Sequence, residues 1–199
     1  MKHLIQQAAP DFTANAVMPN GKICPLTLSQ ENKNKYLVLF FYPLDFTFVC
    51  PSEIISFSNN IAKFEERNAQ VLGVSIDSEY VHHAWRKTPV NSGGIGEITF
   101  PLISDINKEI SQKYGVLLEN GIALRGTFII DTSGIIRHAT LNDLPLGRNV
   151  AETLRLLDAI QFNEKHGEVC PAGWNKGDTA IKPDAQGISD YLGKFASKL

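Results

Sequence analysis

Two of the three cysteines in the chain share a short context, and a thiol is the most nucleophilic side chain that the sequence offers. Cys50 and Cys170 each stand between a valine and a proline, whereas Cys24 follows an isoleucine. A thiolate attacks electrophiles, and two thiols can form a redox-active disulfide. The chain contains no Cys-x-x-Cys motif, so neither a local dithiol of the thioredoxin type nor a four-ligand zinc site is encoded.

The position of Cys50 favours a reactive thiol. An apolar and aromatic run over residues 37–42 ends at Pro43 and predicts a strand that is buried on both faces. Proline is tolerated in the first turn of a helix, so Pro51 predicts that a helix begins close to Cys50. The free N–H groups and partial positive charge of a helix N-terminus stabilise a thiolate. The alternative is an inert cysteine in the core.

Pro43 and Thr47 precede Cys50 and complete a Pro-x-x-x-Thr-x-x-Cys pattern on the loop between the strand and the helix. Thr47 lies one helical turn before Cys50, so its hydroxyl can point at the same site and bond to a bound oxygen. Alternatively Thr47 caps the helix, a role that is compatible with the first. Pro43 would shield a thiolate from water, or it would simply end the strand.

The remaining periodicities predict an α/β protein. A helix over 54–64 lies between the first strand and a second at 71–76, which makes a βαβ unit with parallel strands and a right-handed crossover. The pattern then predicts further helices and strands, at 78–87 (helix), 102–103 (strand), 105–114 (helix), 127–130 and 135–139 (a hairpin) and 150–162 (helix). This order fits a central mixed sheet with helices on both faces.

Composition narrows the classes of protein. The 199 residues suffice for a domain over 1–166 and a tail over 167–199, rich in Gly, Pro, Lys and Asp, that carries Cys170. A net charge of -2 with both signs interspersed gives no case for nucleic acid or an anionic membrane. No apolar segment is long enough to span a bilayer or to form a signal peptide. We therefore expect a cytoplasmic protein.

Two other motifs are weak. His82 and His83 could suggest a metal site, but no third ligand has useful spacing, so a solvated helix face is the better interpretation. The loop 93–96 is glycine-rich but lacks the Lys and Ser/Thr of a phosphate loop.

Four segments together resemble the typical two-cysteine peroxiredoxins, the alkyl hydroperoxide reductase C-type family. Residues 41–53 are similar to the active-site segment of that family, and residues 85–89 to its helix-to-loop segment. Residues 121–131 resemble the strand that carries its catalytic arginine, and residues 168–174 its resolving-cysteine segment. The resemblance extends over essentially the whole chain. It implies a thioredoxin-like fold with a C-terminal extension, and no metal or organic cofactor.

The resemblance also implies roles for single residues. Cys50 matches the peroxidatic cysteine, and Thr47 and Pro43 match its loop partners. Arg125 matches the arginine that binds thiolate and peroxide, although without the resemblance a surface arginine at a strand start is the better interpretation. Glu53 matches a glutamate that orients this arginine, or it complements the helix dipole.

Cys170 matches the resolving cysteine, which in this family comes from the partner subunit's tail. The resemblance therefore implies a thiol peroxidase that reduces hydrogen peroxide and organic hydroperoxides as an obligate homodimer, and it allows a decamer of five dimers. The reductant would be thioredoxin or a dedicated flavoprotein disulfide reductase. Cys24 matches no catalytic position and is read as a spectator.

Two other classes of function stay open. One is a redox-regulated chaperone or peroxide-signalling protein, which is compatible with peroxidase activity. The other is a structural binding module of thioredoxin-like fold, against which the complete set of Pro43, Thr47, Cys50 and Arg125 argues. In the tail, Tyr191-Leu192 stands where peroxide-sensitive family members have Tyr-Phe. We therefore expect intermediate sensitivity to overoxidation.

Overall fold

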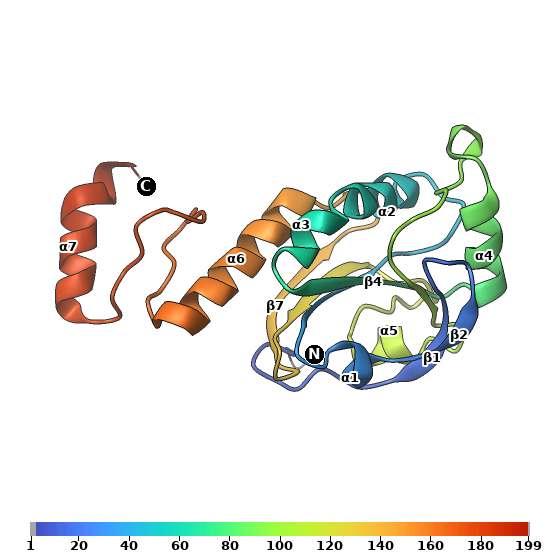
Figure 1. Cartoon of the computed structure of the whole chain (residues 1–199), viewed down its shortest axis with the longest axis horizontal. Helices are drawn as coiled ribbons and strands as arrows, with labels where there is room; N and C mark the ends of the chain where they lie inside the picture. The colour runs from blue at the N-terminus through green and yellow to red at the C-terminus, as the bar shows by residue number, and fades with distance from the viewer. Residues whose placement is uncertain (1–2, 199) are drawn as a thin grey trace. The chain divides into compact units, whose positions relative to one another are not determined.

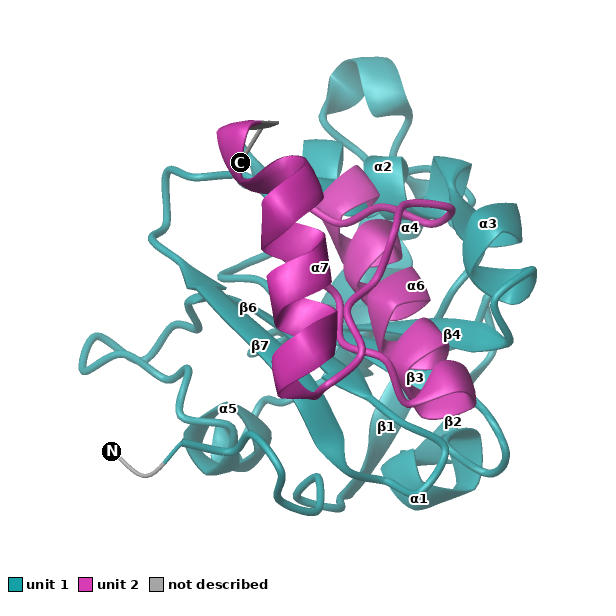
Figure 2. Cartoon of the chain, turned by 90° about the vertical axis from the view of Figure 1, so that its left-hand side faces the viewer, with its two compact units in different colours: residues 1–150 teal, residues 151–199 magenta. Residues whose placement is uncertain are grey.

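The computed structural model describes residues 3–198 and separates into two compact units. The first unit ends at Val150 and the second begins at Ala151, as Figure 2 shows in two colours. This division comes earlier in the chain than the domain boundary expected at 166/167, which stays a prediction. Among the described residues, no helix is long and apolar enough to cross a membrane.

The first unit contains the sheet and most of the helices. Its strands are β1 (Thr13–Val17), β2 (Ile23–Thr27), β3 (Tyr36–Phe41), β4 (Ala69–Ser75), β5 (Leu102–Ser104), β6 (Arg125–Ile130) and β7 (Ile136–Asn142). Its helices are α1 (Leu28–Glu31), α2 (Cys50–Asn59), α3 (Ile61–Glu65), α4 (Glu79–Lys87), the short 3-10 helix η1 (Val90–Ser92) and α5 (Glu109–Lys113). Helix α6 (Val150–His166) begins at the boundary, and α7 (Ala185–Phe195) and η2 (Ala196–Lys198) end the second unit.

The seven strands form one mixed sheet in the order β2-β1-β5-β4-β3-β6-β7. Strand β4 runs parallel to both β3 and β5, while the other neighbours pair antiparallel. In Figure 1, α2 and α3 lie on one side of strand β4 and α5 lies on the other. The predicted βαβ unit, the hairpin of β6 and β7 and the mixed sheet flanked by helices are therefore confirmed.

Strand β3 is buried on both faces, as its unbroken apolar run predicts. Phe41 on one face contacts the rings of Tyr114 and Phe128. Phe40 on the other face stacks on Phe57 of α2 at 4.6 Å between ring centroids. This packing holds α2 against the sheet. It therefore also holds Cys50, the first residue of α2, in place.

Three local features differ from the sequence-based expectation. The hairpin of β1 and β2 was not predicted, because both strands are short and Pro25 interrupts the pattern of β2. The helix expected over 54–64 is broken at Asn60, whose side-chain amide donates a hydrogen bond to the Ser56 carbonyl. Helix α5 is shorter than expected because Lys108 adopts a left-handed conformation with φ of 64°.

Candidate active site

The thiol of Cys50 lies at the start of α2 and is fully buried. Cys50 is the first residue of the helix, and Pro51 follows in the first turn. Val49 occupies the N-cap position without a side-chain cap, so Thr47 does not cap the helix. Instead, the Thr47 hydroxyl lies 2.9 Å from the Cys50 Sγ and 2.8 Å from the Leu44 carbonyl. The hydroxyl is therefore directed at the thiol, which is the first of the two arrangements expected for Thr47.

Arg125 brings a positive charge to the same sulfur. It is the first residue of β6, and its Nη1 lies 3.3 Å from the Cys50 Sγ and 2.6 Å from Glu53 Oε2. Its Nε donates a hydrogen bond to the Leu144 carbonyl at 2.6 Å. The side chain is only 4% exposed, so the alternative of a surface arginine is wrong. Glu53 and Arg125 therefore form a buried ion pair, and the role of Glu53 in orienting Arg125 stays a prediction.

A second arginine, Arg148, which no sequence motif singled out, completes this cluster. The Nε and Nη2 of Arg148 each lie 2.9 Å from an oxygen of Glu53, a two-point pairing of fork and carboxylate. Its Nη1 donates to the carbonyls of Phe41 and Gly126, and its guanidinium lies over the Phe40 ring at 4.8 Å. Burial lowers the pKa of Arg148, and the charge of Glu53 opposes that effect. Arg148 therefore ties α2 to two strands.

The loop between β3 and α2 is held by a buried polar network. Asp45 accepts hydrogen bonds from Tyr42 at 2.8 Å and from His82 of α4 at 2.7 Å. Burial raises the pKa of Asp45, while His82 lowers it. The backbone N–H of Asp45 donates to Asp77, and Phe46 then turns the chain with φ of 55°.

The expected solvated face for His82 and His83 is consequently wrong for His82, which has no exposed surface and joins α4 to the active-site loop. The mistake has a physical cause, because polarity alone cannot distinguish a solvated histidine from one that is buried with a carboxylate partner. Pro43 is buried just after β3.

Cys170 lies in the second unit, where three contacts hold its segment. Its Sγ lies 3.6 Å from the Ala159 carbonyl of α6, and Val169 pairs with Ile181 across an isolated bridge. Arg155, one turn before Ala159, donates from Nη1 to the Trp174 carbonyl at 2.7 Å. Burial raises the pKa of the Cys170 thiol, and the charge of Arg155 opposes that rise. The third cysteine, Cys24, is half-buried on β2.

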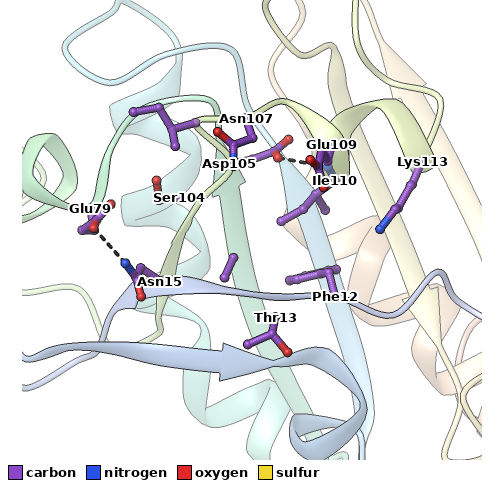
Figure 3. Close-up of a pocket in the computed structure, with 12 residues that line it drawn as sticks. Phe12, Thr13, Asn15, Glu79, Ser104, Asp105, Asn107, Glu109, Ile110 and Lys113 are labelled. Carbon is purple, nitrogen blue, oxygen red and sulfur yellow. Dashed lines mark hydrogen bonds between the residues drawn. The ribbon is translucent and has the colours of Figure 1, made fainter.

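Another hollow on the first unit holds no comparable chemistry. A pocket of about 290 Å³ lies between β1, α4 and α5, and Figure 3 shows the residues that line it, some of whose polar groups pair with one another. Glu79 accepts a hydrogen bond from Asn15, and Asp105 accepts from the backbone N–H groups of Ile110 and Ser111. Throughout residues 3–198, no group of three or more His, Cys, Asp or Glu side chains is placed to hold a metal ion.

Comparison with known proteins decides the family. Residues 5–139 match the model of the AhpC/TSA family, and residues 159–194 match the C-terminal domain of 1-Cys peroxiredoxin. The chain belongs to the AhpC/TSA family. Its peroxiredoxin fold is thioredoxin-like, and the protein is a thiol peroxidase.

Relatives of this AhpC/TSA peroxidase match it over nearly their full length. Alkyl hydroperoxide reductase C of Buchnera aphidicola is 53% identical over 98% of this chain and 99% of its own. Peroxiredoxin-1 of Gallus gallus is 54% identical over 97% of each chain. The crystal structure of reduced 2-Cys peroxiredoxin of Plasmodium vivax superposes with a TM-score of 0.95 at 47% identity, covering 97% of this chain and 100% of that one.

We predict that Thr47→Val slows peroxide reduction by this peroxidase about tenfold or more, because the thiolate loses a hydrogen bond of ~1.5–3 kcal/mol. Thr47→Ser keeps the hydroxyl and should retain most of the rate. Stopped-flow measurement of Cys50 oxidation by hydrogen peroxide gives both values. Equal rates for the valine and serine variants would show that the hydroxyl has no role.

We also predict that Arg155→Gln raises the pKa of Cys170 further, because the charge that opposes burial is removed. The thiolate fraction of Cys170 near neutral pH falls, so formation of the expected disulfide between Cys50 and Cys170 slows and its pH profile moves to higher pH. Rapid-quench measurement of the disulfide from pH 6 to 9 checks this. Arg155→Lys keeps the charge and should keep the profile, while an unchanged profile in Arg155→Gln would contradict the prediction.

Proposed function

We propose that Cys50 is the peroxidatic residue and that Thr47, Arg125 and Glu53 assist it. The convergence of the Thr47 hydroxyl and the Arg125 guanidinium on one buried sulfur supports this proposal. The Cys50 thiolate attacks one oxygen of the peroxide, so an S–O bond forms and the O–O bond breaks. The leaving hydroxide or alkoxide takes a proton and departs as water or alcohol, and Cys50 is left as a sulfenic acid.

Thr47 and Arg125 can stabilise this reaction at different atoms. The fixed donors of the Arg125 guanidinium favour the thiolate before attack and the peroxide oxygens during it. The Thr47 hydroxyl donates to the thiolate, and can then donate to, or accept from, the peroxide. Glu53 fixes Arg125 from behind, and the buried Pro43 would help to exclude water from the thiolate. Arg148 joins this set as a positioning residue through Glu53.

Cys170 of the partner subunit would then resolve the sulfenic acid. Its thiolate attacks the Cys50 sulfur, an S–S bond forms and water leaves. An external dithiol, thioredoxin or a dedicated flavoprotein disulfide reductase, would reduce the disulfide and return both thiols. We propose a homodimer as the functional unit, with a decamer of five dimers as its higher assembly. The cytoplasm, where reducing systems keep thiols reduced, is the proposed location.

A coupled assay with paired cysteine variants tests this cycle. The wild type should consume hydrogen peroxide and an organic hydroperoxide with thioredoxin and its reductase, and Cys50→Ser should consume neither. Cys24→Ser is the matched control and should be fully active. After one equivalent of peroxide, a non-reducing gel should show a disulfide-linked dimer for the wild type and a monomer for Cys170→Ser. An oxidised wild-type monomer would contradict a resolving cysteine from the partner.

The tail helix α7 supports a further prediction about overoxidation. Ile188 and Leu192 lie one turn apart on α7, and each is more than two-fifths exposed. A helix packed over the first turn of α2 would slow the unwinding that releases Cys50 and leave its sulfenic acid open to a second peroxide. Leu192→Phe adds an aromatic ring worth about 1 kcal/mol of packing and should increase the sulfinic acid formed per turnover.

Mass spectrometry of Cys50 at rising peroxide concentration measures this yield. Truncation before Tyr191 should decrease it, and Leu192→Ile, which keeps the apolar volume, should leave it near the wild-type value. If truncation does not change the sulfinic yield, the tail does not govern the step.

A further inference from the structure

A pocket at the C-terminal end of α4 lies outside the proposed active site. Its volume is about 630 Å³. The turn between β1 and β2, the last turn of α4 and the loop that follows η1 line it. Figure 1 shows the position of α4. Its lining includes four ionisable side chains, namely His83, Arg86, Lys87 and Glu97. None of these four side chains has a role in the peroxidase cycle described above.

Arg86 is the unusual member of this set, because it is buried without a carboxylate partner. The residue is 7% exposed, and its Nη2 donates one hydrogen bond to the Pro19 carbonyl at 2.7 Å. Its Nη1 is buried and has no hydrogen-bond partner. Burial lowers the pKa of Arg86, as expected for a charge withdrawn from water. A buried guanidinium with one unsatisfied nitrogen is costly, which points to a further partner that is not part of the chain.

His83 provides a second unsatisfied group at the same pocket. Its Nδ1 is buried and lacks a hydrogen-bond partner, and His83 precedes Arg86 by three residues on α4, which places both on one face of the helix. Lys87 adds an exposed ammonium group. Cations in the last turn of a helix complement its dipole, but exposed side chains would suffice for that purpose, so the dipole does not explain the burial of Arg86.

Glu97 is the only acidic side chain in the lining. Its charge raises the pKa of Arg86, so the carboxylate lies within electrostatic reach. None of the ion pairs described within residues 3–198 joins it to Arg86, and Glu97 is exposed. With Arg86 and Lys87 charged, the lining carries a net positive charge even before any protonation of His83.

We propose that this pocket binds the phosphate group of a small phosphomonoester, or inorganic phosphate itself, through Arg86, Lys87 and His83. A phosphate oxyanion offers several acceptor oxygens to donors from different directions, and a guanidinium fork matches two of them. The volume exceeds what a phosphate ion alone requires, so an organic group can occupy the remainder.

The site is linked to the active-site loop through Trp85, which precedes Arg86. The Trp85 indole Nε1 donates to the Gly93 carbonyl, and its ring lies 5.7 Å from that of Phe46. Phe46 belongs to the loop that carries Thr47. A ligand beside Arg86 should therefore change the environment of the Trp85 indole, which provides a local signal of binding.

Calorimetric titration of the full-length reduced protein in chloride buffer tests the proposal. The probes are inorganic phosphate and ribose 5-phosphate, with acetate as a carboxylate of single charge. We expect Arg86→Met to weaken phosphate binding at least about tenfold, the loss of one charge-assisted hydrogen bond. Arg137→Met, on β7, is the matched control and should bind as the wild type does. Tighter binding of ribose 5-phosphate than of inorganic phosphate would identify the organic ester as the ligand class.

Two milder variants keep the test valid if Arg86→Met folds poorly. Lys87→Gln should weaken phosphate binding several-fold, and Glu97→Gln, which removes the opposing charge, should tighten it several-fold. Phosphate should shift the indole resonance of Trp85 and leave that of Trp174 unchanged. Failure of wild-type protein to bind phosphate, equal binding by wild type and the Arg86, Lys87 and Glu97 variants, or tighter binding of acetate than of phosphate would each overturn the proposal. None of these outcomes depends on Cys50 or Cys170, so the proposed peroxidase cycle is tested separately.

Discussion

A single buried carboxylate, that of Glu53, organises the site. It accepts hydrogen bonds from Arg125 and Arg148, and both guanidinium groups are nearly as buried as the carboxylate itself. These contacts connect the first turn of α2 to the start of β6 and to the segment before α6. Arg148 extends the connection to the backbone of β3 and β6 through the carbonyls of Phe41 and Gly126. The position of the Cys50 sulfur therefore depends on a polar cluster as much as on the apolar core.

Such a cluster is stable only when it is complete. Removal of one partner would leave the others charged and buried, which costs far more than the loss of a surface ion pair. The aromatic layer around Phe40 supports the arrangement, since Phe40 stacks on Phe57 of α2 on one side and lies under the Arg148 guanidinium. Tyr42, Asp45 and His82 provide equivalent support for the loop that bears Thr47. Two polar networks, one around Glu53 and one around Asp45, therefore hold the segments on either side of Cys50, and both contact the chain at the C-terminal end of β3.

Sequence patterns predicted those parts of this structure that depend on local chemistry. The apolar run of β3 predicted where the strand ends, and the proline after Cys50 predicted that a helix begins only a few residues later. The resemblance to a known family pointed to Arg125 and Glu53. Arg148 was missed because it follows an exposed segment without periodicity, and its partner Glu53 is distant in the sequence. His82 was misjudged for a related reason, since its carboxylate partner lies on another element. Long-range polar pairing leaves no periodic pattern in a sequence.

The composition of the Glu53 cluster has a consequence for the oxidised enzyme. With Cys50 as a thiolate, the two negative charges of sulfur and carboxylate balance the two guanidinium groups. Oxidation to a sulfenic acid removes the charge on sulfur but leaves both arginines in place. In the proposed cycle, the first half of the reaction would therefore end with one uncompensated positive charge among buried side chains. Under the proposed cycle, this imbalance of charge would favour entry of water around Cys50 after its oxidation.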